Sequence, residues 1–171
     1  MTDFNALLDP LAEIAREAGR AILDVYERDD LGVETKDDKS PITEADLAAH
    51  KIIEARLQAL TPEIPVFSEE SGGIAYADRK DWPRFWLVDP LDGTKEFIKR
   101  NGEFTVNIAL VEGDTPVLGV VHVPVTAVTY LGGKDVGAFK EHNGERGAIQ
   151  CRERTTPVVM VASRSHGGEA V

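Results

Sequence analysis

The hydrophobic pattern of this chain changes its period near Pro65, and this change constrains the fold more than any other feature of the sequence. Before Pro65 the apolar residues recur every three or four positions, as they do on one face of an amphipathic helix. After Pro65 they alternate with polar residues, as in half-buried strands. Helices followed by a run of strands favour an α+β class over strict βαβ alternation. We therefore expect two amino-terminal helices packed on a mainly antiparallel sheet.

The first helix is expected to begin at Asp9-Pro10, because aspartate is a good N-cap and proline is tolerated in the first turn. A second helix is expected to follow Thr43, with Asp46 in its first turn, and to end before Thr61-Pro62. The apolar face predicted for this second helix contains Leu47, Ala48, Ile52, Ala55, Leu57 and Leu60.

Strands are predicted at residues 66–68, 85–88, 104–111, 117–123, 128–131, 137–141 and 157–162. In the third of these, Thr105, Asn107 and Ala109 share one face because side chains alternate along a strand. The turn residues Glu112-Gly113-Asp114 predict a hairpin, and hence antiparallel pairing with the next strand.

The charge and cysteine content exclude several classes of function. The formal net charge is −11, which argues against binding to nucleic acid, because that requires clustered Lys and Arg. Cys151 is the single cysteine, so no internal disulfide can form and a reducing compartment fits best. The amino terminus lacks the order of a signal peptide, and no apolar run is long enough for a transmembrane segment. We expect a cytoplasmic protein, with peripheral attachment to the inner face of the membrane as an alternative.

The residues that point most clearly to chemistry follow the apolar segment 86–88. They read Asp89-Pro90-Leu91-Asp92-Gly93-Thr94. A turn here could bring both carboxylates toward one point and leave the Leu91 carbonyl facing inward, and a hard cation such as Mg²⁺ prefers such oxygen ligands. Asp-Pro and Asp-Gly are also common turn dipeptides, so this segment alone fits either a plain turn or a metal site.

A second acidic cluster, Ser68-Glu69-Glu70-Ser71, also comes directly after an apolar strand. If the two strands are neighbours, Glu69 would lie beside Asp89. Several carboxylates gathered in an apolar fold repel one another unless cations share them, and two bridged cations form a clamp for phosphoryl transfer. Gly93 and Thr94 are expected to open a short helix over 95–99, whose free amides could hold phosphate oxygens.

These segments resemble the signature of the magnesium-dependent phosphomonoesterases of the inositol monophosphatase superfamily. That signature has an Asp near the start of the second helix, a Glu-Glu pair and an Asp-Pro-Ile/Leu-Asp-Gly-Thr run, which correspond to Asp46, Glu69-Glu70 and residues 89–94. The run Lys95-Glu96-Phe97 is similar to the 3'(2'),5'-bisphosphate nucleotidases of the CysQ type, as are residues 39–46 and 163–166. The resemblance extends over nearly the whole chain from Asp9 onward.

The resemblance implies a role for each matched residue. Glu69, Asp89, Asp92 and the carbonyl of Leu91 would hold two or more Mg²⁺ ions, with Asp89 bridging. Thr94, oriented by Asp46, would help to activate the attacking water together with Glu69. The substrate contacts would come from Gly93, Thr94, Lys36 and Lys39, although an exposed loop explains the two lysines equally well. The implied reaction is hydrolysis of adenosine 3',5'-bisphosphate to AMP and phosphate, with the sulfated 3'-phosphoadenylyl analogue as a further substrate.

One part of the family signature has no counterpart before Val171, namely Trp-Asp followed by Gly-Gly, which supplies another carboxylate to the second metal. We therefore expect residues 1–160 to form a metal-binding amino-terminal domain and 161–171 to be the start of a truncated carboxy-terminal domain. Two alternatives stay open: a phosphatase of the same superfamily that acts on an inositol or sugar phosphate, and an inactive metal-binding fragment. An exposed apolar domain surface would also allow a homo-oligomer.

Overall fold

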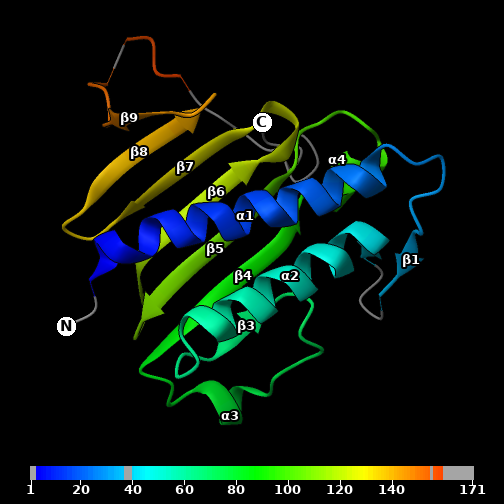
Figure 1. The fold of residues 1–171 in the computed structure, drawn as a ribbon, viewed down its shortest axis with the longest axis horizontal. Helices are drawn as coiled ribbons and strands as arrows, with labels where there is room; N and C mark the ends of the chain where they lie inside the picture. Colours follow the sequence, from blue (N-terminus) through cyan, green and yellow to red (C-terminus); the bar gives the residue numbers. More distant parts are fainter. Residues whose placement is uncertain (1–2, 37–39, 155, 160–171) are drawn as a thin grey trace.

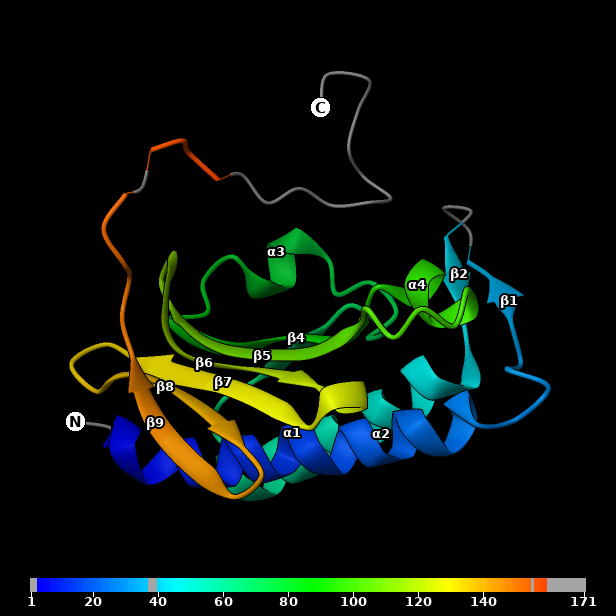
Figure 2. The ribbon, with the colours of Figure 1, turned by 90° about the horizontal axis from the view of Figure 1, so that it is seen from above.

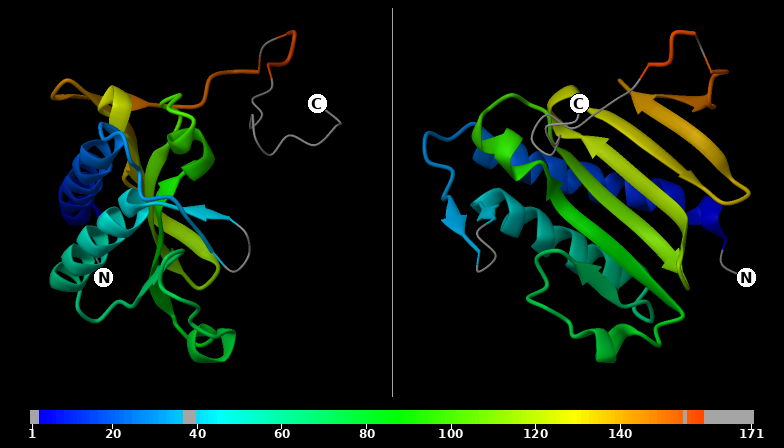
Figure 3. Two further views of the ribbon diagram at one scale, coloured as in Figure 1. Left: turned by 90° about the vertical axis from the view of Figure 1, so that its right-hand side faces the viewer. Right: turned by 180° about the vertical axis from the view of Figure 1, so that it is seen from behind.

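The computed structural model describes residues 3–36, 40–154 and 156–159. The two long helices, α1 (Phe4–Tyr26) and α2 (Glu44–Leu60), lie side by side on one face of a seven-stranded sheet (Figure 1). Helix α1 packs on β5, β6 and β7, and α2 packs on β3 and β4, so that both helices are on the same side (Figures 2 and 3). The predicted α+β class is confirmed.

The seven strands follow one another across the sheet in chain order. They are β3 (Val66–Ser68), β4 (Arg84–Asp92), β5 (Thr105–Glu112), β6 (Thr115–Val123), β7 (Val128–Gly133), β8 (Gly137–His142) and β9 (Glu145–Ile149). Among these described strands, β3 and β4 run parallel and the other neighbours pair antiparallel, including the predicted hairpin between β5 and β6. A separate ribbon is formed by β1 (Glu34–Thr35) and β2 (Pro41–Ile42).

Two predictions about strands need correction. Strand β9 was not predicted, because its residues are exposed throughout and show no apolar alternation. Residues 157–159 do not form the predicted strand, and the remainder of that segment lies outside the described residues. The predicted boundary at residue 160 falls there as well and stays a prediction.

The first helix begins earlier than predicted. Its N-cap is Asp3, whose carboxylate accepts a hydrogen bond from the Asn5 amide at 3.0 Å, and Pro10 lies inside the helix. A proline there removes one helical hydrogen bond. The extra turn is retained because Leu7 and Leu8 are buried in the core, and burial of each such side chain contributes about 1.5–3 kcal/mol.

The second helix starts after Thr43 as predicted, but its buried face differs from the prediction. Leu47 is 41% exposed and Ala55 is exposed, whereas the buried side is formed by Ala45, Asp46, Ala49, Ile53 and Leu57. The apolar residues on this helix are too evenly distributed to identify the core side. The polar residues Thr43 and Asp46 decide it, since they satisfy each other in the capping box and can therefore be buried.

An aromatic cluster joins the helices to the end of the sheet near β4. The rings of Tyr26, Phe97 and Phe104 pack with centroids 5.1 to 5.3 Å apart. Phe97 belongs to the short helix α4 (Thr94–Ile98), so this cluster fixes α4 against the carboxyl end of α1. Helix α4 and the ribbon of β1 and β2 lie at the same end of the molecule (Figure 2). Two further short helices are α3 (Tyr76–Arg79) and the 3₁₀ turn η1 (Pro124–Thr126).

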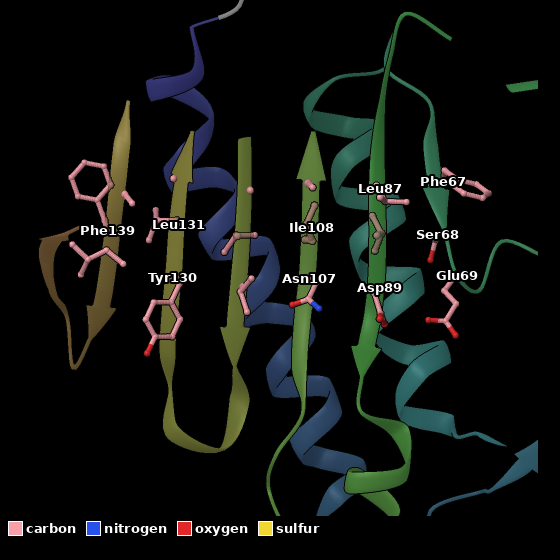
Figure 4. Close-up of a pocket in the computed structure, with 18 of the residues that line it drawn as sticks. Phe67, Ser68, Glu69, Leu87, Asp89, Asn107, Ile108, Tyr130, Leu131 and Phe139 are labelled. Atoms are coloured by element: carbon pink, nitrogen blue, oxygen red, sulfur yellow. The ribbon is translucent and has the colours of Figure 1, made fainter. Parts of the chain in front are cut away.

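The face of the sheet opposite α1 and α2 is open and largely apolar. Leu87, Val121, Tyr130 and Ile149 on this face are each about 40% exposed, and the face forms a shallow hollow of about 850 Å³ (Figure 4). In the part of the chain that the structure describes, no helix combines the length and the apolar character needed to cross a bilayer.

Candidate active site

The first part of the candidate site lies where β3 ends against the parallel strand β4. Ser68 pairs with Val88, and the Glu69 amide donates a hydrogen bond to the Val88 carbonyl at 3.0 Å. The residue that follows each member of this pair is acidic: Glu69 comes directly after β3, and Asp89 lies in β4. Their side chains lie beside each other in a row with Asn107 from β5 (Figure 4). The expectation that the two acidic clusters lie together is confirmed, although only β3 ends at this point.

The geometry of residues 89–92 differs from the turn that we predicted. Strand β4 continues through Asp92, and a bulge between Asp89 and Asp92 shifts its register against β5. Pro90 falls at this bulge, where its missing N–H removes no ladder hydrogen bond. The chain turns at Gly93, whose φ of 101° favours glycine and whose Cβ, if present, would come within 2.9 Å of the Glu103 carbonyl.

Asp46 and Thr94 form the second part of the site. The Thr94 hydroxyl lies 3.1 Å from Asp46 Oδ1 and 3.3 Å from the carbonyl of Leu91. The other oxygen of Asp46, Oδ2, accepts hydrogen bonds from the amide and the hydroxyl of Thr43 at 2.8 and 2.6 Å. Asp46 is only 2% exposed, so its carboxylate is held from both sides. Burial raises the pKa of Asp46, although the bonds from Thr43 and Thr94 oppose this rise.

The electrostatics of the site are dominated by crowded acidic groups. Burial, followed by the charges of Glu69 and Asp92, raises the pKa of Asp89 from 3.8 to about 7. Asp92 is exposed, and its Oδ2 accepts a hydrogen bond from Asn107 Nδ2 at 3.1 Å. The charges that act on Asp89 are thus those of other acids, and a nearby cation would stabilise its ionised form.

Lys36 provides the cationic group on the other side of Glu69. Its ammonium group donates to Glu70 Oε1 at 2.6 Å and to Glu69 Oε1 at 3.2 Å. Burial lowers the pKa of Lys36, but the bonds and charges of the two glutamates outweigh this effect and raise it. Lys39 lies outside the described residues. The structure thus places Lys36 beside the acidic cluster.

A pocket of about 260 Å³ joins most of the predicted site residues. Its walls are formed by Ser40, Pro41, Glu69, Asp89, Leu91, Asp92, Gly93, Thr94, Lys95 and Glu96. Asp46 and Lys36 do not line this pocket, but Asp46 accepts a hydrogen bond from Thr94 and Lys36 donates one to Glu69. Asn107, which contacts Asp92, was not predicted as a site residue. Its position on the polar face of a predicted strand, next to the acidic strand end, was the available signal.

The donors around this pocket fit a hard divalent cation. They are carboxylate and carbonyl oxygens, which Mg²⁺ prefers, and the raised pKa of Asp89 reflects negative charge that a cation would relieve. Within the described residues no three acidic, histidine or cysteine side chains converge into a closed ligand cluster. Mg²⁺ does not require one, because it usually keeps several waters and takes one or two carboxylates.

Comparisons with known proteins identify the family of this chain. Residues 5–169 match the model of the inositol monophosphatase family. The chain is 52% identical over 161 residues to the 3'(2'),5'-bisphosphate nucleotidase CysQ of Salmonella typhimurium, covering 94% of this chain and 64% of that protein. The corresponding CysQ of Escherichia coli K12 is 51% identical over the same share of both chains.

Solved structures of the same family share the fold. The crystal structure of CysQ from Bacteroides thetaiotaomicron is 44% identical and superposes with a TM-score of 0.66 over 85% of this chain and 51% of its own. The extragenic suppressor protein suhB of Bartonella henselae is 31% identical, with a TM-score of 0.73 over 87% of this chain and 56% of its own. The chain thus spans between about half and two thirds of the length of these relatives.

Proposed function

This chain belongs to the inositol monophosphatase family, and from that premise we propose that it serves a magnesium-dependent phosphomonoesterase that hydrolyses adenosine 3',5'-bisphosphate to AMP and phosphate. The observation that carries the proposal is the hydrogen bond from the Thr94 hydroxyl to the buried Asp46 carboxylate, at the edge of a pocket that Glu69, Asp89 and Asp92 line. The bisphosphate substrate is inferred from the likeness to the CysQ nucleotidases. The sulfated 3'-phosphoadenylyl analogue is a second candidate substrate.

Glu69, Asp89, Asp92 and the Leu91 carbonyl are the residues that would hold Mg²⁺. When bound, the cations would supply Lewis-acid activation of water and neutralise charge on the phosphoryl group. The raised pKa of Asp89, which comes first from burial and then from the charges of Glu69 and Asp92, supports this assignment, because a bound cation would stabilise the ionised carboxylate in these surroundings.

Thr94 and Asp46 would orient the attacking water and take its proton. Asp46 Oδ1 is the nearer of the two acceptors of the Thr94 hydroxyl, and when the hydroxyl donates to it the lone pairs of Thr94 Oγ1 are available to accept a hydrogen bond from water. As water attacks phosphorus, its proton would pass to Thr94 Oγ1 while Thr94 passes its own to Asp46. The raised pKa of Asp46 makes that carboxylate a better acceptor for this proton.

Phosphate binding would involve the backbone at Gly93 and Thr94, where α4 begins and its first amides have no helical partner. Lys36 stays a proposed phosphate ligand, since its ammonium group already lies at Glu69. Lys39 is proposed only from its place in the loop between β1 and β2. A small nucleotide bisphosphate is thus the expected partner.

The test is phosphate release from adenosine 3',5'-bisphosphate by the purified chain, with and without Mg²⁺, beside inositol 1-phosphate. Selective, magnesium-dependent release from the nucleotide would support the proposal, whereas preference for inositol 1-phosphate would favour the other phosphatases of the superfamily. A folded chain that binds Mg²⁺ without any release would instead support the inactive metal-binding fragment.

Two substitutions at Thr94 sharpen the test. Thr94→Ala removes the hydroxyl that is to relay the proton, and we expect a rate loss of about 10²- to 10⁴-fold, typical of general acid–base groups. Thr94→Ser keeps the hydroxyl and should retain most of the rate. Equal loss in both variants would mean that the methyl group, and not the hydroxyl, matters at this position.

A further inference from the structure

Helix α2 makes a second polar contact with the sheet, between His50 and Ser68, that the proposed reaction does not use. Asp46, His50 and Glu54 follow one another at intervals of four residues, so they lie along one side of the helix. His50 Nδ1 is 3.0 Å from the Ser68 hydroxyl, and His50 Nε2 is 3.7 Å from Glu54 Oε2. The His50 side chain is 14% exposed and Ser68 is 3% exposed. The contact is therefore largely shielded from water.

Ser68 directly precedes the acidic turn that contains Glu69 and Glu70. Its hydroxyl accepts a hydrogen bond from the Glu70 amide at 3.3 Å, and its amide donates to the Ser71 hydroxyl at 3.1 Å. The Ser71 amide in turn donates to the Ser68 carbonyl at 3.0 Å. The backbone of Glu69 is held between these bonds and its own bond to Val88. The orientation of the Ser68 hydroxyl thus influences where the Glu69 carboxylate stands.

The direction of the hydrogen bond between His50 and Ser68 follows from the groups that surround the two side chains. The Glu54 carboxylate faces His50 Nε2 and favours the tautomer with the proton on that nitrogen. His50 Nδ1 is then an acceptor, and the Ser68 hydroxyl donates to it while accepting from the Glu70 amide. Ser68 has both of its hydrogen-bonding roles filled and is almost fully buried, so it is suited to holding the turn and not to acting as a nucleophile.

We propose that His50 is a positioning residue, which fixes the Glu69-Glu70 turn through Ser68 so that the Glu69 carboxylate is aimed into the pocket beside Asp89. The link to cation binding rests on the proposed function, whereas the link from His50 to the order of the turn does not. Helix α2 then supports both halves of the site, Thr94 through Asp46 and Glu69 through His50.

The experiment compares His50→Leu, His50→Asn and Ser68→Ala with the parent chain. Leucine removes the ring nitrogens at similar volume, and the asparagine amide can reach roughly the position of Nδ1. Lys51→Leu is the matched control, because Lys51 is the exposed neighbour of His50 on the same helix. Amide hydrogen exchange of the segment 66–72 without cation reports the order of the turn, and Mg²⁺ titration calorimetry reports the cation site.

We expect His50→Leu to speed exchange in 66–72 by about fivefold, in line with the loss of one hydrogen bond. Ser68→Ala should speed it by at least as much, because it also removes the acceptor of the Glu70 amide. Both should weaken Mg²⁺ binding by about tenfold, the range seen when a ligand loses its supporting partner. Lys51→Leu should change neither, and His50→Asn should recover most of both. The double variant should be no worse than Ser68→Ala alone, because Ser68→Ala already removes the contact with His50.

Each other outcome overturns a defined part of the argument. Unchanged exchange in His50→Leu and Ser68→Ala overturns the positioning role outright. Faster amide exchange in 66–72 with unchanged Mg²⁺ affinity overturns the proposed connection between His50 and the Glu69 carboxylate. If the parent itself does not bind Mg²⁺, the proposed function fails, while the exchange measurement still decides whether His50 orders the turn. If His50→Leu does not fold, Ser68→Ala and His50→Asn carry the same comparison.

Discussion

Asp89→Asn should stabilise the chain at neutral pH in the absence of divalent cations, although it removes a proposed metal ligand. The folded structure raises the pKa of Asp89 from 3.8 to about 7, first by burial and then by the charges of Glu69 and Asp92. At about 1.4 kcal/mol per pKa unit, the ionised carboxylate costs the folded state about 4 kcal/mol above pH 7. Solvent reaches this half-buried group and screens part of that cost, so we expect about 2–3 kcal/mol. The neutral amide of asparagine avoids it.

The sign and the pH window follow from the direction of the shift. Because the folded state binds a proton more tightly than the unfolded chain, the stability associated with Asp89 is fully present below pH 3.8 and is lost as the pH rises to about 7. The parent and Asp89→Asn should therefore unfold at similar urea concentrations near pH 4. The variant should become progressively more stable than the parent up to about pH 7, and the difference should then remain constant.

Urea unfolding at several pH values, followed by tryptophan fluorescence in the presence of a chelator, measures this difference. Adding Mg²⁺ should narrow the gap at pH 8, because a cation that binds the folded parent stabilises it. A variant that is equally or less stable at pH 8 than the parent would refute the reasoning. So would a gap that is the same at pH 4 and pH 8, since it would have no connection with the ionisation of Asp89.

The remaining predictions address the second metal ligand and the core. Asp92→Asn should weaken Mg²⁺ binding by calorimetry and abolish any phosphate release while leaving the circular dichroism spectrum unchanged, because Asp92 is exposed. Thr61→Val should cost about 1–3 kcal/mol in urea unfolding, since it leaves the buried indole N–H of Trp86, now 2.8 Å from the Thr61 hydroxyl, without an acceptor; Thr61→Ser should cost much less. Gly19→Ala should also destabilise the chain, because its Cβ would come within 2.7 Å of His122, and overpacking of about 1–3 kcal/mol exceeds the roughly 1 kcal/mol gained in a helix interior. A stabilised Gly19→Ala would show that His122 has room to move.

The arrangement of the acidic residues was predictable because it depends on the pairing of two strands. Two apolar segments that each lead into carboxylates predict two strands, and their parallel pairing brings Glu69, just after β3, beside Asp89 within β4. The contact between Asp46 and Thr94 could not be derived from spacing, because it joins residues 48 positions apart through the packing of α2. It was expected only from the family resemblance. The pairing of Lys36 with Glu69 and Glu70 likewise depends on a long-range contact.

The bulge in β4 shows a different limit of sequence reasoning. The residues Asp89-Pro90-Leu91-Asp92 have strong turn propensity, and we therefore predicted a turn. In the structure Asp89 and Asp92 are both paired with β5, on either side of a bulge, and Leu91 within the bulge is buried in the core at 3% exposure. The real change of direction occurs at Gly93, where only the local backbone conformation and the approach of Glu103 require glycine. Tertiary burial here overrides local propensity.

The buried side of α2 was predicted wrongly for a reason that bears on function. An amphipathic helix is oriented by its apolar residues, yet the side of α2 that faces the sheet carries Thr43, Asp46 and His50. Shielding polar groups from water is unfavourable unless each finds a partner, and each does: buried Thr43 with Asp46, buried Asp46 with Thr94, and partly exposed His50 with Ser68. Simple core packing would favour apolar residues at these positions. That α2 instead buries polar groups whose partners lie at the two strand ends indicates that this face serves the site, and the His50 variants test that reading directly.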